Sequence, residues 1–193
     1  MKIADLGRPV GHSANLYAWG KTQVVKLYEP ELPREHVLAM GKLEKALFDA
    51  GLPVPEVFEL VEIEGQLGQV YERIEGRTFA DVLLTVTSAE ADCVEQYARL
   101  FGEVQATIHA AAADDFDAPN FKTEIPDILE RIEILHPKLR KKVLDHLAQL
   151  PDGDRICHGD YHPFNVIQSP RGPVVVDWLY VRKGAPLADF AWT

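Results

Sequence analysis

Residues 157–165 read Cys157-His158-Gly159-Asp160-Tyr161-His162-Pro163-Phe164-Asn165, and this stretch decides the fold of the chain. The segment is polar, whereas its surroundings contain apolar strands predicted around Val166-Ile167 and Val174-Val176. Loops beside such strands are where a protein scaffold commonly holds its functional groups.

Three polar side chains in and after this segment have the composition of a metal site. Asp160 and Asn165 lie five residues apart, and Asp177 ends the second apolar strand. Carboxylate and amide oxygens are the ligands that Mg²⁺ prefers, and one of the acids can instead accept the proton of an attacking hydroxyl. Each residue alone could serve only to satisfy the amides of a turn. The three together, at this spacing, favour a site.

The pattern His-Gly-Asp-x-x-x-x-Asn, followed by an apolar strand that ends in Asp177-Trp178, resembles the aminoglycoside phosphotransferase family, which has the protein-kinase-like fold. The segment from Gly184 to Asp189 is similar to the family's G-x-P-x-x-D motif. The resemblance covers essentially the whole chain. It implies that Asp160 is the catalytic base or the acid that orients the hydroxyl, and that Asn165 and Asp177 bind Mg²⁺. It also implies that Asp189 and His158 brace the loop.

The resemblance further implies an α+β, two-lobed fold. Residues 1–75 would form a β-rich N-terminal lobe that clamps the nucleotide, and residues 76–193 an α-rich catalytic lobe. Family members usually continue with several more helices after this point, so we expect the second lobe to be incomplete.

Hydrophobic periodicity places the individual elements. The sequence predicts strands at 15–19, 23–28, 57–63 and 66–74, with one helix from Arg34 to Ala50 among them. It predicts a long helix from Thr87 to about Ala112, opened by a capping-box pattern at 87–90, and two shorter helices at 127–135 and 138–150.

The nucleotide clamp is assigned from the family's order of motifs. Lys26 stands mid-strand, where a lysine is ordinarily a solvated side chain. By the resemblance, Lys26 contacts the phosphates of ATP or GTP, and Gly11, His12 and Ser13 belong to the loop that covers them. The carbonyl of Glu72 and the amide of Ile74 would pair with the edge of the base, and their side chains would then matter little.

One departure concerns the helix glutamate that pairs with the strand lysine in kinase-like enzymes. The family's position for this glutamate falls on Met40, and the nearest acid on that helical face is Glu44. Two interpretations stay open: Glu44 substitutes for the missing glutamate, or the pair is absent and Lys26 is held in another way.

Charge and composition limit the classes of partner. Lys and Arg number 20 and Asp and Glu number 30, which gives a formal net charge of −10 and argues against nucleic-acid binding. The N-terminus has no apolar signal core and no apolar run is long enough for a membrane span, so we expect a cytoplasmic protein without membrane contact. An uncovered apolar face of the long helix would favour a homo-oligomer.

The resemblance therefore implies a small-molecule kinase. It would move the γ-phosphoryl group from an Mg-bound nucleotide to a hydroxyl of a small and cationic acceptor, such as an aminoglycoside or a related amino-alcohol. The alternative is a pseudokinase-like module that binds a nucleotide or a partner without turnover. A protein kinase fits less well, because Asp177 is followed by Trp178 and no segment resembles an activation loop.

Overall fold

The computed structural model describes residues 2–10, 15–86 and 91–192, which form two compact units. The first unit comprises Met1–Ala91 and Phe164–Val176, and the second comprises Asp92–Pro163 and Asp177–Thr193. The chain therefore leaves the second unit after Pro163 and returns to it at Asp177.

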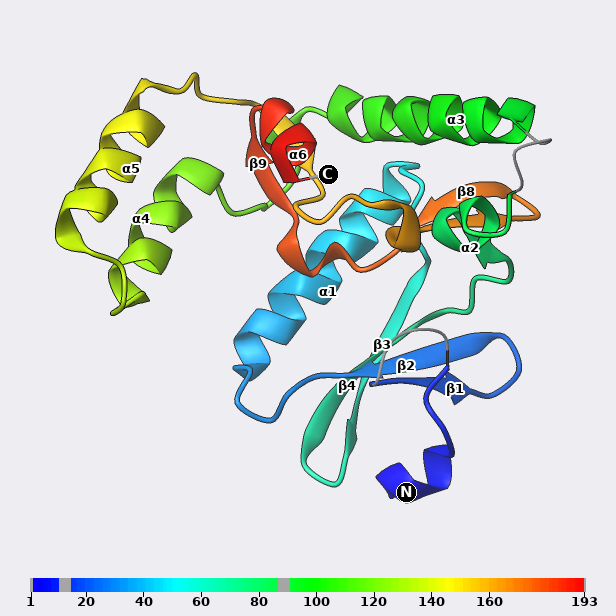
Figure 1. Ribbon diagram of the computed structural model, residues 1–193. Coiled ribbons are helices and arrows are strands. Elements are labelled where there is room, and N and C mark those ends of the chain that lie inside the picture. Colours follow the sequence, from blue (N-terminus) through cyan, green and yellow to red (C-terminus); the bar gives the residue numbers. More distant parts are fainter. Residues whose placement is uncertain (1, 11–14, 87–90, 193) are drawn as a thin grey trace. The chain divides into compact units, whose positions relative to one another are not determined.

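The first unit contains a four-stranded antiparallel sheet with the strand order β1-β2-β4-β3 (Figure 1). Its strands are β1 (Leu16–Trp19), β2 (Gln23–Leu27), β3 (Val57–Ile63) and β4 (Gln66–Glu72), preceded by the short helix η1 (Ile3–Leu6). All four strands predicted for this region are present, with ends that differ by at most two residues.

One face of this sheet carries a buried apolar cluster, and Lys26 points from the other. Val25, Leu27, Ile63 and Val70 form a buried apolar cluster on one face. Each such side chain, when fully buried, contributes on the order of 1.5–3 kcal/mol to folding. Side chains alternate along a strand, so Lys26 points to the opposite face, as the sequence predicts.

Helix α1 (Arg34–Asp49) packs against strands β3 and β4. Its residues Val37, Met40, Leu43 and Leu47 are buried, which confirms the predicted apolar face. Gly41 brings the helix close to the sheet: a Cβ atom at this position would lie 2.7 Å from Oε1 of Gln69. The helix ends before Gly51, whose φ of 81° suits glycine.

A smaller sheet completes the first unit. Strands β5 (Arg77–Thr78), β7 (Val166–Ser169) and β8 (Gly172–Val175) are antiparallel, and helix α2 (Phe79–Leu83) follows β5. The amide of Val175 donates to the carbonyl of Pro53 at 2.7 Å. This bond ties the β7–β8 hairpin to the segment that follows α1.

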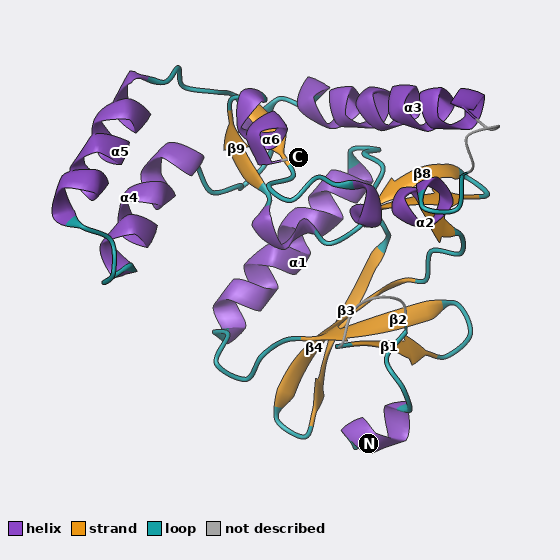
Figure 2. Ribbon diagram, viewed as in Figure 1, coloured by secondary structure: helices purple, strands orange, loops and turns teal. Residues whose placement is uncertain are grey.

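The second unit is mainly helical (Figure 2). It contains η3 (Ala113–Asp115), η4 (Pro163–Asn165, which runs into the first unit) and η5 (Trp178–Tyr180), the paired strands β6 (Arg155–Cys157) and β9 (Arg182–Gly184), and the helices α3 (Ala91–Ala110), α4 (Phe121–Arg131), α5 (Pro137–Gln149) and α6 (Leu187–Trp192). Within the described ranges, no helix combines the length and the apolar character that crossing a membrane requires.

Helix α4 begins earlier than the sequence predicts. The sequence predicts a helix over 127–135, whereas the helix covers Phe121–Arg131. The reason is a cap: the side chain of Asn120 accepts a hydrogen bond from the amide of Lys122 at 2.8 Å, so the helix starts ahead of Pro126. At the other end, Ile132 is extended and ends the helix.

The long helix is present as predicted over its described part. Val104 and Ile108 on its apolar face are buried, whereas Val94 is 45% exposed. The capping-box residues 87–90 lie outside the described residues.

Candidate active site

A tight turn after strand β6 presents Asp160. His158 is fully buried, and its Nδ1 accepts a hydrogen bond from the amide of Asp160 at 3.2 Å. Gly159 has a φ of 80°, and a Cβ atom there would lie 2.2 Å from the carbonyl oxygen of Tyr180. Only glycine fits this position, and the turn leaves the side chain of Asp160 half-buried, 3.5 Å from Nε2 of His162.

The carboxylate of Asp189 accepts hydrogen bonds from two backbone amides of this turn. Its Oδ2 accepts the amide of His158 at 2.8 Å, and its Oδ1 accepts the amide of Gly159 at 2.7 Å. The side chain is fully buried, so both bonds form away from water. These contacts confirm the bracing role expected for Asp189.

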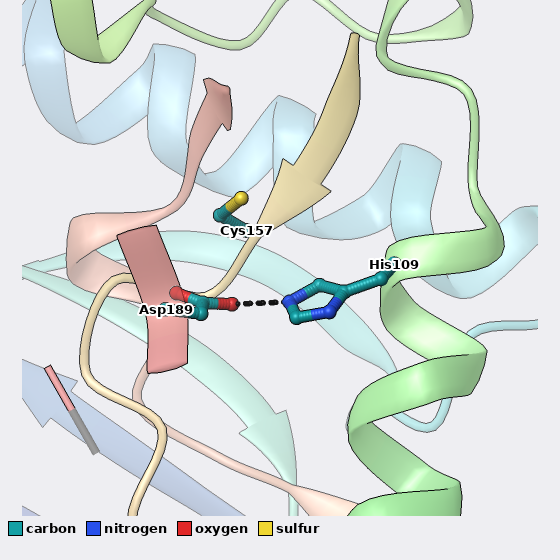
Figure 3. A group of neighbouring side chains, drawn as sticks. All are labelled: His109, Cys157 and Asp189. Atoms are coloured by element: carbon teal, nitrogen blue, oxygen red, sulfur yellow. Dashed lines mark hydrogen bonds and ion pairs between the residues drawn. The ribbon is translucent and has the colours of Figure 1, made fainter. Parts of the chain in front are cut away.

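His109 at the end of helix α3 completes the brace. Its Nε2 lies 2.9 Å from Oδ2 of Asp189 (Figure 3). The imidazole is 8% exposed, and its ring also packs edge-on against Phe190. His109 therefore fixes the carboxylate that fixes the turn.

His109, Cys157 and Asp189 bring three ligand-type atoms within 4.8 Å of one another, which raises the question of a metal ion (Figure 3). Burial, with a smaller contribution from Asp189, raises the pKa of the Cys157 thiol to about 12. Both oxygens of Asp189 already accept hydrogen bonds. The contacts fit a hydrogen-bonded brace better than a metal centre.

Asp177 stands at the point where the chain re-enters the second unit. Its backbone is left-handed, with φ 66° and ψ 60°, and its side chain is exposed. Non-glycine residues seldom adopt this conformation, although Asp and Asn tolerate it better than others. Such a conformation commonly occurs where a side chain must be held in one place for function.

Asn165 belongs to the first unit and is 8% exposed. Its carbonyl accepts the amide of Val176 at 2.9 Å. The residue that precedes Asp177 in the chain is therefore hydrogen-bonded to Asn165.

The first unit also carries Lys26 and Glu44. Glu44 lies on α1, one turn after the buried Met40, and is itself 5% exposed. The hydroxyl of Tyr71 hydrogen-bonds to Glu44 and lies 2.9 Å from the hydroxyl of Tyr28. Burial first and Glu44 second raise the pKa of Tyr71, which keeps its phenol protonated and able to donate.

Glu72 is the last residue of strand β4, and Ile74 lies two residues beyond it. The amide of Arg73 donates to the carbonyl of Thr22 at 2.9 Å, so the residues on either side of Arg73 direct their backbone groups away from β2. The amide of Glu72 accordingly donates to the carbonyl of Glu56 at 2.9 Å. Among the described residues, no hydrogen bond to the carbonyl of Glu72 or from the amide of Ile74 is present.

The first unit carries Lys26, Glu44, Glu72, Ile74 and Asn165, and the second carries Asp160 and Asp177. The residues predicted to cover the phosphates, Gly11, His12 and Ser13, lie outside the described residues.

Several residues that support these groups were missed by sequence reasoning: His109, Tyr28, Tyr71 and Arg171, whose Nη2 lies 2.7 Å from Oε2 of Glu72. Each acts through a partner far away in the sequence, and none belongs to a short motif. A histidine in the last turn of an amphipathic helix was the one available signal, and it is a weak one.

The chain belongs to the phosphotransferase enzyme family, whose model matches residues 8–193. A curated relative, Acyl-CoA dehydrogenase family member 11 of Gallus gallus, is 29% identical over 194 residues. That match includes 86% of this chain but only 24% of the relative. The chain therefore spans about a quarter of the length of that protein.

Solved structures of the same fold include two kinds of small-molecule kinase. Aminoglycoside phosphotransferase APH(3'')-Id from Streptomyces rimosus, solved with ADP and streptomycin, is 17% identical with a TM-score of 0.67, over 98% of this chain and 78% of that one. A choline/ethanolamine kinase family protein from Mesorhizobium loti is 18% identical with a TM-score of 0.63, over 97% and 62%. The chain has the protein-kinase-like fold of these enzymes, as the sequence predicts.

Proposed function

We propose that this chain transfers the γ-phosphoryl group of Mg-bound ATP to a hydroxyl of a small molecule. The observation that carries the proposal is the pair of hydrogen bonds that the Asp189 carboxylate accepts from the amides of His158 and Gly159. These bonds hold the turn that presents Asp160. Phosphoryl transfer depends chiefly on positioning and on charge neutralisation, and a braced acidic loop meets the first requirement.

In this proposal Asp160 accepts the proton of the attacking hydroxyl or orients it. Lys26 contacts the phosphates, with Glu44 taking the place of the glutamate that Met40 replaces. The burial of Glu44 and its bond to Tyr71 support this assignment, because they fix the carboxylate on the face of the sheet to which Lys26 points. Gly11, His12 and Ser13 would cover the phosphates.

The donor set of Asn165 and Asp177 fits a magnesium ion. Both offer hard oxygen atoms, and the left-handed backbone of Asp177 is the kind of constraint found at functional sites. When bound, Mg²⁺ would supply neutralisation of the phosphate charge. Asn165 and Asp177 would hold it.

The acceptor is a small molecule with a hydroxyl group and, we propose, a positive charge. The net charge of −10 suits a cationic ligand, and one neighbour of the same fold was solved with streptomycin. Choline-like alcohols belong to the same chemical class, and the reaction would take place in the cytoplasm.

Two measurements test the proposal. Isothermal titration calorimetry should detect binding of MgATP, and labelled phosphate should move from ATP to an acceptor in a panel of amino-sugars and amino-alcohols. Asp160→Asn should lose transfer and keep binding, whereas the exposed Asp145→Asn in helix α5 is the matched control and should keep both. Failure of the wild-type chain to bind MgATP would overturn the proposal.

A second candidate is a module that binds nucleotide without turnover. The buried Met40, at the position where the family has glutamate, favours it. Binding of MgATP with no transfer to any acceptor and no ATP hydrolysis would support this reading over the enzyme.

A further inference from the structure

The side chain of Glu72 has an unusual hydrogen-bond arrangement at the end of strand β4. In an antiparallel ladder, the two residues of a hydrogen-bonded pair normally exchange both of their backbone bonds. The amide of Glu72 donates to the carbonyl of Glu56 at 2.9 Å. The amide of Glu56, however, donates to Oε2 of the Glu72 side chain, at 3.2 Å.

Because the Glu56 amide donates to the side chain, the backbone carbonyl of Glu72 accepts no hydrogen bond from that amide. On the β2 side, the hydrogen-bonded pairs are Thr22 with Arg73 and Tyr28 with Leu67, and alternation excludes Glu72 from that set. A backbone carbonyl with no donor from either neighbouring strand is free to accept one from a ligand.

Arg171 holds the Glu72 carboxylate in this position. Its Nη2 lies 2.7 Å from Oε2 of Glu72 and 3.1 Å from the carbonyl oxygen of Val54. Arg171 comes from the turn between β7 and β8, where the hydroxyl of Ser169 donates to the carbonyl of Gly172 at 2.6 Å. A charge-assisted bond from a braced turn restricts the carboxylate to the geometry that captures the Glu56 amide.

We infer that Glu72 and Arg171 are positioning residues for the nucleobase, and that they make the site selective for adenine. The Glu72 carboxylate accepts the hydrogen bond of the Glu56 amide, which leaves the backbone carbonyl of Glu72 available. That carbonyl then accepts a hydrogen bond from the 6-amino group of the base. The amide of Ile74, two residues further along the chain, donates to the neighbouring ring nitrogen. Guanine carries an oxygen in place of that amino group, so two acceptors would face each other. The inference rests on the proposed nucleotide site and goes beyond it, because it assigns the side chain of Glu72 a role.

The test compares MgATP with the triphosphate of purine riboside, which lacks the 6-amino group, by calorimetric binding to the intact chain. Loss of one hydrogen bond should weaken wild-type binding about tenfold. In Glu72→Ala, the Glu56 amide returns to the backbone carbonyl, and the ratio of the two dissociation constants should fall close to one. In Glu72→Gln, the side-chain oxygen can still accept the Glu56 amide, so most of the ratio should return.

Arg171→Met should reduce the same ratio, and Arg34→Met is its matched control. Arg34 lies in the same unit and pairs with the exposed Glu62, so its removal should leave the ratio unchanged. A merely structural role would weaken both ligands equally and leave the ratio at its wild-type value in Glu72→Ala and in Arg171→Met, which would overturn the inference. Wild-type binding of neither nucleotide would instead overturn the proposed function, and with it the inference.

Discussion

His109 lies 2.9 Å from the carboxylate of Asp189, although 80 residues separate the two in sequence. The same carboxylate holds the amides of His158 and Gly159 at 2.8 and 2.7 Å. One buried acid thus connects helix α3, helix α6 and the turn that carries Asp160. The stability of this unit and the geometry of the proposed catalytic loop depend on the same group.

Asp189→Asn should therefore affect both properties. An amide has one acceptor oxygen and places an N–H group against at least one of the backbone donors, which leaves a buried donor unsatisfied. We expect the free energy of unfolding to fall by about 1–3 kcal/mol, measured by urea denaturation. Phosphoryl transfer should fall more steeply than MgATP binding. Equal stability of Asp189→Asn and the surface variant Asp145→Asn would contradict this account of the brace.

The sequence was sufficient for parts of the structure that depend on local patterns. The alternation around Lys26 predicted its face of the sheet, and the periodicity of residues 37–47 predicted the buried side of α1. The start of α4 was missed because it depends on a single cap by Asn120 within a stretch that reads as a loop.

Long-range partners could not be predicted in the same way. Arg171 and Glu72 are 99 residues apart, and nothing in either local sequence marks them as a pair. Sequence reasoning accordingly treated the side chain of Glu72 as unimportant. Its capture by Arg171 and by the Glu56 amide became visible only when the three segments were placed together.

Two substitutions at Asp177 should separate its backbone role from its chemical role. Asn tolerates the left-handed conformation, so Asp177→Asn should melt near the wild-type temperature while losing Mg²⁺-dependent turnover. Asp177→Ala should lose turnover and in addition about 1–2 kcal/mol of stability, because alanine does not adopt that conformation readily. Calorimetric melting and a coupled ADP assay measure the two effects. Near-normal turnover by Asp177→Asn would remove Asp177 from the proposed metal site.

Asp160→Ala should distinguish a catalytic role from a binding role. Because Asp160 is proposed to act on the acceptor hydroxyl, kcat should fall far more than the affinity for MgATP. Single-turnover transfer and calorimetric binding provide the two numbers. If affinity falls and the rate of transfer by saturated protein does not, Asp160 serves in nucleotide binding or in structure.

Two helical glycines provide a matched pair for the packing of α1 on the sheet. A Cβ atom at Gly41 would lie 2.7 Å from Oε1 of Gln69, whereas at Gly102 it would meet nothing within 4 Å. Gly102→Ala should raise stability by about 1 kcal/mol through helix propensity alone.

Gly41→Ala should gain less than Gly102→Ala or become destabilising. Its Cβ atom displaces Gln69, whose amide donates to the carbonyls of Phe58 and Glu59 at 3.0 and 3.1 Å, where the register of β3 shifts. Chemical denaturation of the two variants side by side gives the comparison. An equal gain at both positions would show that Gln69 moves without cost.

The buried groups around Asp189 also predict how stability depends on pH. Burial first and Asp189 second raise the pKa of Cys157 to about 12 and the pKa of Tyr161 well above its usual value. In the unfolded chain both groups release their protons at lower pH. The folded state therefore holds protons that the unfolded state loses, and the stability that these groups contribute is complete below pH 9 and is lost as the pH rises toward 12.

Removing the Cys157 thiol should make the free energy of unfolding depend less steeply on pH. Between pH 10 and 11, the free energy of unfolding should fall less steeply in Cys157→Ala than in the wild-type chain, by about 1.4 kcal/mol per pH unit for one proton. Cys93→Ala, which removes the other thiol, is the matched variant, and the difference between the two isolates the buried group. Urea denaturation at pH 8, 10 and 11 measures the slopes. Identical slopes in Cys157→Ala and Cys93→Ala would mean that the Cys157 thiol does not titrate differently in the folded and unfolded states.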